Sequence, residues 1–161
     1  MSSGLTIRVR CQQDCAIVTV AGEIDIASVA RLRERLSSMA AGGLPLIVDL
    51  NGVGFIDAAG LGVLAGAASQ AAAHGVSLQV ACAQSRTRRL LRLTRLDRRL
   101  RLAFTVAEAQ QALAAEKTLT SNDPPRLPRL ADCKYQVVDD RSPHRAAFLA
   151  RSTPVRHKGK A

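Results

Sequence analysis

Aliphatic and polar residues alternate at the start of this chain and then recur at helical spacing, which predicts two strands followed by a helix. Residues 5–9 are aliphatic at every second position, the pattern of a half-buried strand. A turn at residues 12–14 leads to a second aliphatic run at 16–21, so the two strands are expected to form a hairpin. Gly22 is expected to turn the chain toward the helix. The apolar residues at helical spacing are Val29, Leu32, Leu36 and Met39.

Residues at both ends of this helix are of the types that begin and end helices. Asp25 or Ser28 can cap its start, because a side-chain oxygen of either residue can accept a hydrogen bond from a free amide of the first turn. Gly42 and Gly43 are expected to end it.

Residues 46–73 predict a strand, a turn and a second helix. Residues 46–50 form a short aliphatic run, as a buried strand would. Turn residues follow at 51–52, and residues 55–56, Phe and Ile, are expected to return to the core. Asp57 is placed to cap the helix that follows.

The second helix is rich in small residues. Glycines at three positions keep it thin, so its N-terminus can approach another backbone or a phosphate. These glycines are Gly60, Gly62 and Gly66. The face expected to meet the sheet comprises Leu61, Leu64, Ala68 and Ala72. The opposite side, nearer Gly62, Gly66 and Ser69, is expected to be smooth, and His74 and Gly75 are expected to end the helix.

Two more strands and two more helices complete the pattern. Alternation predicts a strand at residues 76–80, and residues 84–96 predict a helix with its arginines outward. The leucines expected to point inward are Leu90, Leu93 and Leu96. A short strand at 103–106 and a helix at 107–116 follow. The order β-β-α-β-α-β-α-β-α predicts an α/β fold with a mixed, mostly parallel sheet of about five strands and about four helices.

The last part of the chain differs in composition. Residues 1–116 are expected to form one domain, and residues 117–161 are polar, basic and contain several prolines, so we expect a disordered tail. The net charge is +10, and residues 86–116 alone hold eight arginines against three acidic residues. Such basicity suits either a solvated helix face or a docking surface for an acidic partner. An aromatic content of 2% leaves little to stack on bases, which argues against nucleic-acid binding.

Several classes of protein are not expected. Residues 1–10 lack the apolar segment of a signal peptide, so the cysteines are expected to be free thiols in a reducing cytoplasm. Cys11 and Cys15 lack a matching second Cys/His pair, so we expect no metal site. Asp57 and Gln70 interrupt the apolar run at 53–73, so we expect no membrane span. The sequence has no catalytic triad pattern and no paired-glycine nucleotide fingerprint, so we expect a binding protein without cofactor rather than an enzyme.

Three short runs resemble the signature of STAS domains of the anti-sigma factor antagonist (anti-anti-sigma factor) family. Residues 22–25, Gly-Glu-Ile-Asp, resemble the Gly-Glu-Leu-Asp run that follows the second strand in these domains. Residues 57–61, Asp-Ala-Ala-Gly-Leu, resemble their Asp-Ser-Ser-Gly-Leu or Asp-Ser-Thr-Gly-Leu run. Residues 93–97, Leu-Thr-Arg-Leu-Asp, resemble their Leu-Thr-Gly-Leu-Asp run, with Arg95 replacing the glycine. The resemblance covers residues 5–116 and implies the same order of strands and helices.

The resemblance implies a function in transcription regulation by protein–protein interaction. A cytoplasmic member of the family binds an anti-sigma factor, a serine kinase of the GHKL type, and so frees a sigma factor. The kinase phosphorylates the first hydroxyl residue of the run, and the added charge disrupts binding. The implied partner-binding residues are Glu23, Asp25, Ser28, Asp57, Ala58, Ala59, Gly60, Leu61 and Gly62.

The acceptor position itself departs from the family. Ala58 has no oxygen and cannot take a phosphate, so the protein is expected to be locked in its binding state or regulated by abundance or another signal. Ser28 or Ser69 could be modified instead. An alternative is a non-phosphorylatable STAS scaffold, or a module that senses a ligand such as a nucleotide. The purely structural alternative is that Asp57 only caps the helix and the glycines only allow close packing.

Overall fold

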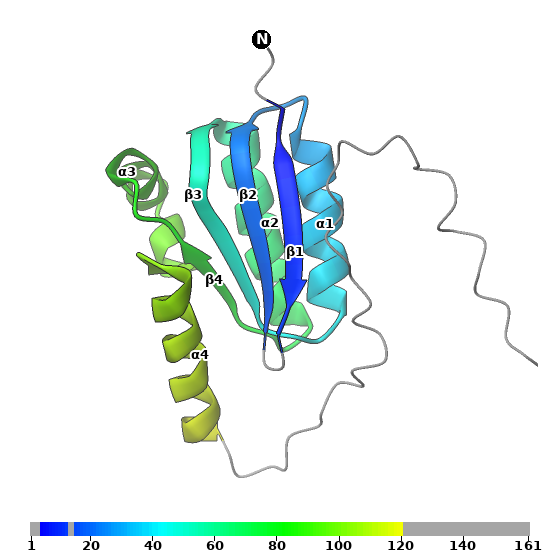
Figure 1. Cartoon of the computed structure of the whole chain (residues 1–161), viewed down its shortest axis with the longest axis vertical. Helices are drawn as coiled ribbons and strands as arrows, with labels where there is room; N and C mark the ends of the chain where they lie inside the picture. Colours follow the sequence, from blue (N-terminus) through cyan, green and yellow to red (C-terminus); the bar gives the residue numbers. More distant parts are fainter. Residues whose placement is uncertain (1–3, 13–14, 121–161) are drawn as a thin grey trace, which may run out of the picture.

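A five-stranded sheet with helices on both faces forms the body of the protein (Figure 1). The structure is a computed structural model, and it describes residues 4–12 and 15–120. The strands are β1 (Thr6–Cys11), β2 (Ala16–Ile24), β3 (Leu46–Ile56), β4 (Leu78–Ala81) and β5 (Arg101–Ala103). The helices are α1 (Val29–Ala41), α2 (Ala58–Ala73), α3 (Ser85–Leu93), the short 3-10 helix η1 (Leu96–Arg98) and α4 (Val106–Thr120).

The sheet has the predicted mixed topology. Its strand order is β1-β2-β3-β4-β5, with β1 and β2 antiparallel and the remaining neighbours parallel. The hairpin, the α/β class and the element order are therefore confirmed. Helices α1 and α2 lie together on one face of the sheet, and α4 lies on the other (Figure 1).

Two apolar clusters hold these layers together. The larger lies between the sheet and the α1–α2 layer, and its most enclosed side chains include Ile24, Leu32, Leu36 and Leu64. The smaller lies under α4 and includes Ile47, Ala109 and Leu113. The predicted apolar stripe of α1 is confirmed, because all four of its members are buried.

Strands β2 and β3 are longer than predicted, and the turns expected at Gly22 and at residues 51–52 are wrong. Gly22 has φ +101° and lies at a register shift within the β2–β3 pair, so the strand bulges there and continues. Gly52 lies against Ala21 so closely that a β-carbon on it would be 2.8 Å from the Ala21 Cβ. The two glycines thus let the paired strands stay in contact through the irregularity.

The expected return of Phe55 to the core is also wrong. Ile56 is buried on the α1–α2 side of the sheet, and neighbouring strand residues point to opposite faces. Phe55 therefore points to the other face and remains 46% exposed.

The buried face of α2 is shifted from the one predicted. It comprises Gly60, Val63, Leu64, Ala67 and Ala71, whereas Leu61 and Ala68 are half-buried and Ala72 is exposed. A helix made almost entirely of small apolar residues has little hydrophobic contrast between its faces, so spacing alone could not select the buried one. The predicted smooth side is confirmed, since Gly62, Gly66 and Ser69 are exposed.

The third helix is shorter than predicted. It ends at Leu93, and Arg95 adopts the left-handed conformation with φ 56° before η1 begins. Within the helix Thr87 and Leu91 face the core, so Leu91 is fully buried and Leu90 is half-buried, whereas Leu93 lies on another side and is 70% exposed, against the prediction for Leu93. Leu96 is buried as expected.

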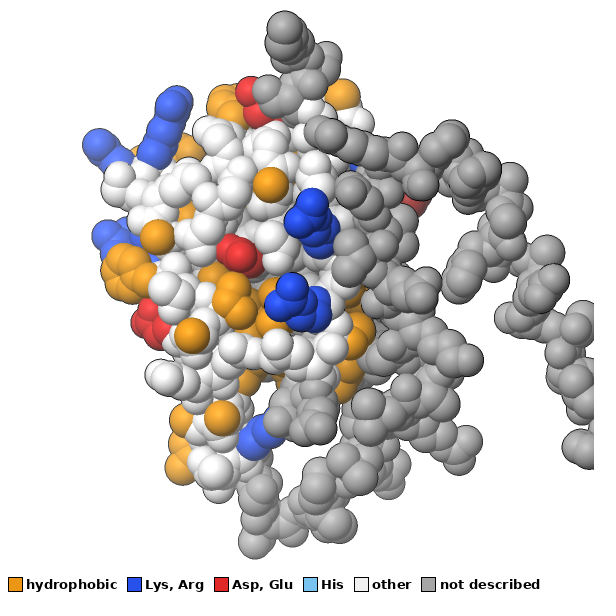
Figure 2. Space-filling model, viewed as in Figure 1, with side chains coloured by type: hydrophobic (Ala, Val, Ile, Leu, Met, Phe, Trp, Pro, Cys, Tyr) orange, Lys and Arg blue, Asp and Glu red, His pale blue; other side chains and the backbone are white. Residues whose placement is uncertain are grey.

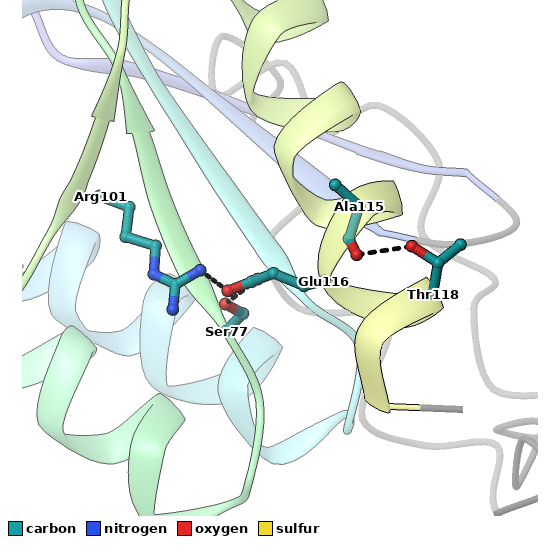
Figure 3. Close-up of polar contacts among 5 residues, drawn as sticks. All are labelled: Ser77, Arg101, Ala115, Glu116 and Thr118. Atoms are coloured by element: carbon teal, nitrogen blue, oxygen red, sulfur yellow. Dashed lines mark hydrogen bonds and ion pairs between the residues drawn. The ribbon is translucent and has the colours of Figure 1, made fainter. Parts of the chain in front are cut away.

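The final elements also have different bounds. Strand β5 ends at Ala103, whereas the strand was predicted at residues 103–106. Helix α4 continues to Thr120, beyond the predicted end at residue 116. Within α4, Glu116 accepts a hydrogen bond from the Ser77 hydroxyl at 3.0 Å and pairs with Arg101 (Figure 3). These contacts fasten the helix to the sheet. The disordered tail was predicted to begin at residue 117, which is wrong for residues 117–120 because they belong to α4. The rest of the predicted tail, residues 121–161, lies outside the described residues.

Candidate functional site

Asp57 fixes the start of α2. Its carboxylate accepts a hydrogen bond from the Gly60 amide at 2.8 Å, and its backbone is extended, with φ −95° and ψ −178°. The Asp57 amide itself donates to the Ile24 carbonyl at 3.1 Å. The predicted N-cap is therefore confirmed, and the cap residue is tied directly to the end of β2.

A second capped turn links β2 to α1. The Asp25 carboxylate accepts from the amides of Ala27 and Ser28 at 3.1 and 2.9 Å. The Ser28 hydroxyl accepts from the Asp25 amide at 3.0 Å and donates to the Glu23 carbonyl at 3.1 Å. Hydrogen bonds from Ser28, first from its side chain and then from its amide, hold the pKa of Asp25 below its usual value. Ser28 precedes the helix without capping it, so Asp25 is the residue that organises the turn.

The two turns lie side by side because Gly60 packs against the strands. A β-carbon on Gly60 would lie 2.6 Å from Ile24 Cγ2 and 2.8 Å from Ile56 Cγ1. Ile24 and Ile56 are themselves paired at the carboxyl ends of β2 and β3. The two predicted runs, residues 22–25 and 57–61, are thus brought to one edge of the sheet.

The predicted site residues differ in what they expose. Glu23, Ala58 and Gly62 are exposed, whereas Asp25, Ser28, Asp57, Ala59 and Leu61 are half-buried. Gly60 is buried, so its place in the site is to let the helix approach the strands rather than to contact a partner. Ala58 is the first residue of α2 and faces solvent, while Ala59 packs against the core.

Two exposed apolar side chains near these turns were not predicted. Ile26 lies in the turn between Asp25 and Ser28 and is 79% exposed. Phe55 is paired with Glu23 across the two strands and is exposed on the far face of the sheet. Alternation from Ile56 was the one sequence signal that could have placed Phe55 outside. Large apolar side chains beside a polar turn are typical of protein contact surfaces.

An open groove of about 250 Å³ runs between α1 and α2 beside the site. Its lining includes Arg33, Ser37, Gly62, Gly66 and Gln70. The Ser37 hydroxyl donates to the Gln70 side-chain oxygen at 2.7 Å and so joins the two helices across it. Pockets for drug-sized ligands usually measure about 300–1,000 Å³. The groove is therefore smaller and more open than a typical enclosed ligand cavity.

Within residues 4–12 and 15–120 no group of His, Cys, Asp and Glu is arranged to hold a metal ion. No helix in the same part of the chain is long and apolar enough to cross a bilayer. Burial raises the pKa of the Cys82 thiol, which keeps it protonated and unreactive. His74 lies at the opposite end of α2 from Asp57.

The mixed sheet and the two adjoining turns at its edge form the fold of a known domain family. The chain belongs to the STAS domain family, whose model matches residues 6–109. The anti-sigma-F factor antagonist RsfB of Mycobacterium tuberculosis is 33% identical over 106 residues, which cover 65% of this chain and 86% of that protein. The anti-sigma-B factor antagonist of Bacillus subtilis is 34% identical over 92 residues, covering 57% and 84%.

A solved structure gives the same result. The crystal structure of an anti-sigma factor antagonist from Mycobacterium paratuberculosis matches with a TM-score of 0.66 and 28% identity. The match covers 71% of this chain and 97% of that one. The fold predicted from the element order is therefore confirmed by the comparison as well as by the sheet topology.

Proposed function

We propose that this protein is an anti-sigma factor antagonist that binds an anti-sigma factor, a serine kinase of the GHKL type, and so frees a sigma factor. Two relatives at 33% and 34% identity carry the name of anti-sigma factor antagonists, which supports the class. The proposed contact surface comprises the turn from Glu23 to Ser28 and the start of α2 from Asp57 to Gly62. Its half-exposed carboxylates and exposed Ile26 offer polar and apolar contacts together.

The observation that carries the proposal is the position of Ala58. It is exposed at the first turn of α2, directly after the cap Asp57, where helix amides and dipole favour an incoming phosphate. An alanine at this position has nearly the same size and the same lack of charge as an unphosphorylated serine, from which it differs by one oxygen. The protein would therefore bind its partner constitutively, with control exerted through its abundance or at another residue.

The test is binding to the anti-sigma factors of the same cell, measured by titration calorimetry. Asp57→Lys is expected to weaken binding about tenfold or more, because it reverses a charge in the proposed contact surface. Glu34→Lys is the matched control, since it makes the same charge change on the exposed side of α1. Asp57→Asn keeps a good helix cap and removes only the charge. Equal affinity of wild type, Asp57→Lys and Glu34→Lys would overturn the site.

The ligand-sensing alternative needs a different readout. The α1–α2 groove is small and open, so it gives this alternative little support. A rise in melting temperature on addition of a nucleotide would nevertheless favour it over the antagonist function.

A further inference from the structure

Eight arginines lie between residues 86 and 101, and the structure gives two of them internal partners. Arg88 donates to the carbonyls of Cys82 and Ala103 at 2.9 and 3.1 Å, and its guanidinium lies 3.8 Å from the centre of the Phe104 ring. Arg101 pairs with Glu116 (Figure 3). These two side chains hold α3, β5 and α4 in place.

The other six arginines are exposed, and within the described part of the chain none of them forms an ion pair. We call them the arginine surface: Arg86, Arg89, Arg92, Arg95, Arg98 and Arg99. Figure 2 shows basic side chains projecting from the side of the molecule where Figure 1 draws α3. Arg86, Arg89 and Arg92 follow one another at three-residue spacing, so they are neighbours along one side of the helix.

The helix dipole favours only one member of this surface, Arg92, which lies in the last turn of α3. Helix α3 has no acidic residue in its first turn, where arginine is unfavourable because the helix dipole is positive there. Arg95 has φ 56°, and it is the single residue other than glycine with a positive φ in the described residues. A glycine would adopt this conformation without strain, so an arginine at position 95 makes the fold less stable than a glycine would.

An apolar side chain lies within the arginine surface. Leu93 is 70% exposed, and it lies four positions after Arg89, so the two are neighbours on the helix. A leucine gains nothing from contact with a phosphate backbone, whereas a protein partner can bury it. Arginine guanidinium groups also match carboxylates in a forked, two-bond geometry.

The arginine surface has a fixed position on the domain. The Ala83 amide donates to the Asn51 side-chain oxygen at 2.7 Å, and the Gln84 side chain donates to the Asn51 carbonyl at 2.9 Å. These bonds anchor the start of α3 to β3, the strand that continues to the Asp57 turn. The backbone that carries the start of the arginine surface is therefore pre-positioned, so binding has to order the arginine side chains but not the helix.

From these observations we propose that the arginine surface is a second docking site, and that its occupant is an acidic protein segment that also carries leucine-like apolar residues. The site lies on a different helix from the proposed anti-sigma contact surface, and it does not depend on that function. Carboxylates of the segment pair with Arg86, Arg89 and Arg92, and an apolar side chain covers Leu93.

The test uses the full-length protein and a synthetic peptide of glutamate and leucine about 20 residues long, long enough to span the three arginines as a helix. Fluorescence anisotropy measures binding of the peptide to wild type and to two triple variants. The α3 variant has Arg86, Arg89 and Arg92 all replaced by glutamine, and the control variant has Arg8, Arg10 and Arg35 all replaced by glutamine. Both variants lose three positive charges and keep the basic tail. The α3 variant is expected to bind about tenfold more weakly than the control, with affinity falling as salt rises.

Further measurements separate the possible occupants. Leu93→Ser is expected to weaken binding of the peptide but not of a 20-base-pair DNA duplex or of vesicles containing phosphatidylserine. Replacing the three arginines by lysine keeps the charge and removes the forked geometry, so intermediate affinity is expected. Equal binding by the α3 variant and the control overturns the proposal. The proposal is also overturned if wild type binds the duplex or the vesicles more tightly than it binds the peptide. Circular dichroism checks that each variant is folded, and the single variant Arg92→Gln gives the same comparison if the triple variant is not.

Discussion

Gly60 lies so close to Ile24 that a β-carbon on it would be 2.6 Å from Ile24 Cγ2. Ile24 is fully buried, and Ile56 on the other strand is also buried with its Cγ1 2.8 Å from the same position, so neither can move aside freely. Gly60→Ala is therefore expected to destabilise the protein by about 1–3 kcal/mol through overpacking. Urea denaturation followed by circular dichroism measures the change.

Gly62 provides the control for this prediction. It lies in the same helix, and a β-carbon on it would meet nothing within 4 Å. Gly62→Ala is expected to stabilise the protein by up to about 1 kcal/mol, because alanine is the better helix former. If both substitutions change stability equally, close packing of Gly60 is not what joins the two turns.

Arg95 is expected to be a strained position. Because its φ is 56°, Arg95→Gly should raise the free energy of unfolding by about 0.5–1 kcal/mol, even though glycine is more flexible in the unfolded chain. Arg99 has φ −94°, so Arg99→Gly should lower it instead. Thermal unfolding at several salt concentrations separates strain from charge repulsion, since only the latter is screened. A loss of stability in Arg95→Gly would contradict the prediction.

Gln79 carries a buried polar group without a partner. The residue is 1% exposed on β4, and its side-chain Nε2 has no hydrogen-bond partner within the described residues. Gln79→Met keeps the length of the side chain and removes this amide, so we expect stabilisation of about 1 kcal/mol. Gln79→Glu places a charge in the same position and should be strongly destabilising. Chemical denaturation of the two variants at pH 7 measures both effects.

Asp25 gives a prediction about pH. Hydrogen bonds from Ser28 lower the pKa of Asp25 from 3.8 in the folded protein. The ionised carboxylate therefore stabilises the folded protein fully when the pH is above the pKa that Asp25 has in the unfolded chain. That contribution is lost as the pH falls through the lower, folded value. The stability difference between wild type and Asp25→Asn should therefore shrink between pH 5 and the acid limit of folding. A difference that does not change with pH would show that the charge of Asp25 is not what organises the turn.

The parts of the fold that were predicted correctly have strong contrast between apolar and polar positions. Residues 5–9 alternate, and the apolar residues of α1 form a stripe among charged ones, so both were placed on the correct face. The N-cap at Asp57 was predicted because a carboxylate just before a helix commonly accepts a hydrogen bond from a free amide of the first turn, here that of Gly60. The two turns of the candidate site were identified by resemblance, and their proximity needed the packing of Gly60 against Ile24.

The missed features depend on contacts between distant residues or on unusual backbone. The register of α2 is set by how closely Gly60 approaches two strands, which its own apolar sequence does not reveal. The end of α3 depends on Arg95 adopting a conformation that favours glycine, so an unbroken helix was expected. The long β2 and β3 strands depend on paired irregularities at Gly22 and Gly52, which each look like turns when taken alone.

The decisive measurement is phosphorylation of wild type and Ala58→Ser by an anti-sigma kinase that binds the protein, followed by binding of the products. The substitution adds one oxygen at an exposed helix start, so its effect on stability should stay within about 0.5 kcal/mol. Ala59→Ser is the matched control, because Ala59 is half-buried against the core. Mass spectrometry locates any phosphate, and calorimetry measures partner affinity before and after the reaction.

We expect wild type and Ala59→Ser to remain unmodified at residues 57–62. We expect Ala58→Ser to be phosphorylated and then to lose partner affinity, because the phosphate adds about two negative charges beside Asp57. Phosphorylation of wild type at Ser28 or Ser69, with loss of binding, would contradict the locked state. Phosphorylated Ala58→Ser that binds as tightly as wild type would contradict the placement of the contact surface at the start of α2.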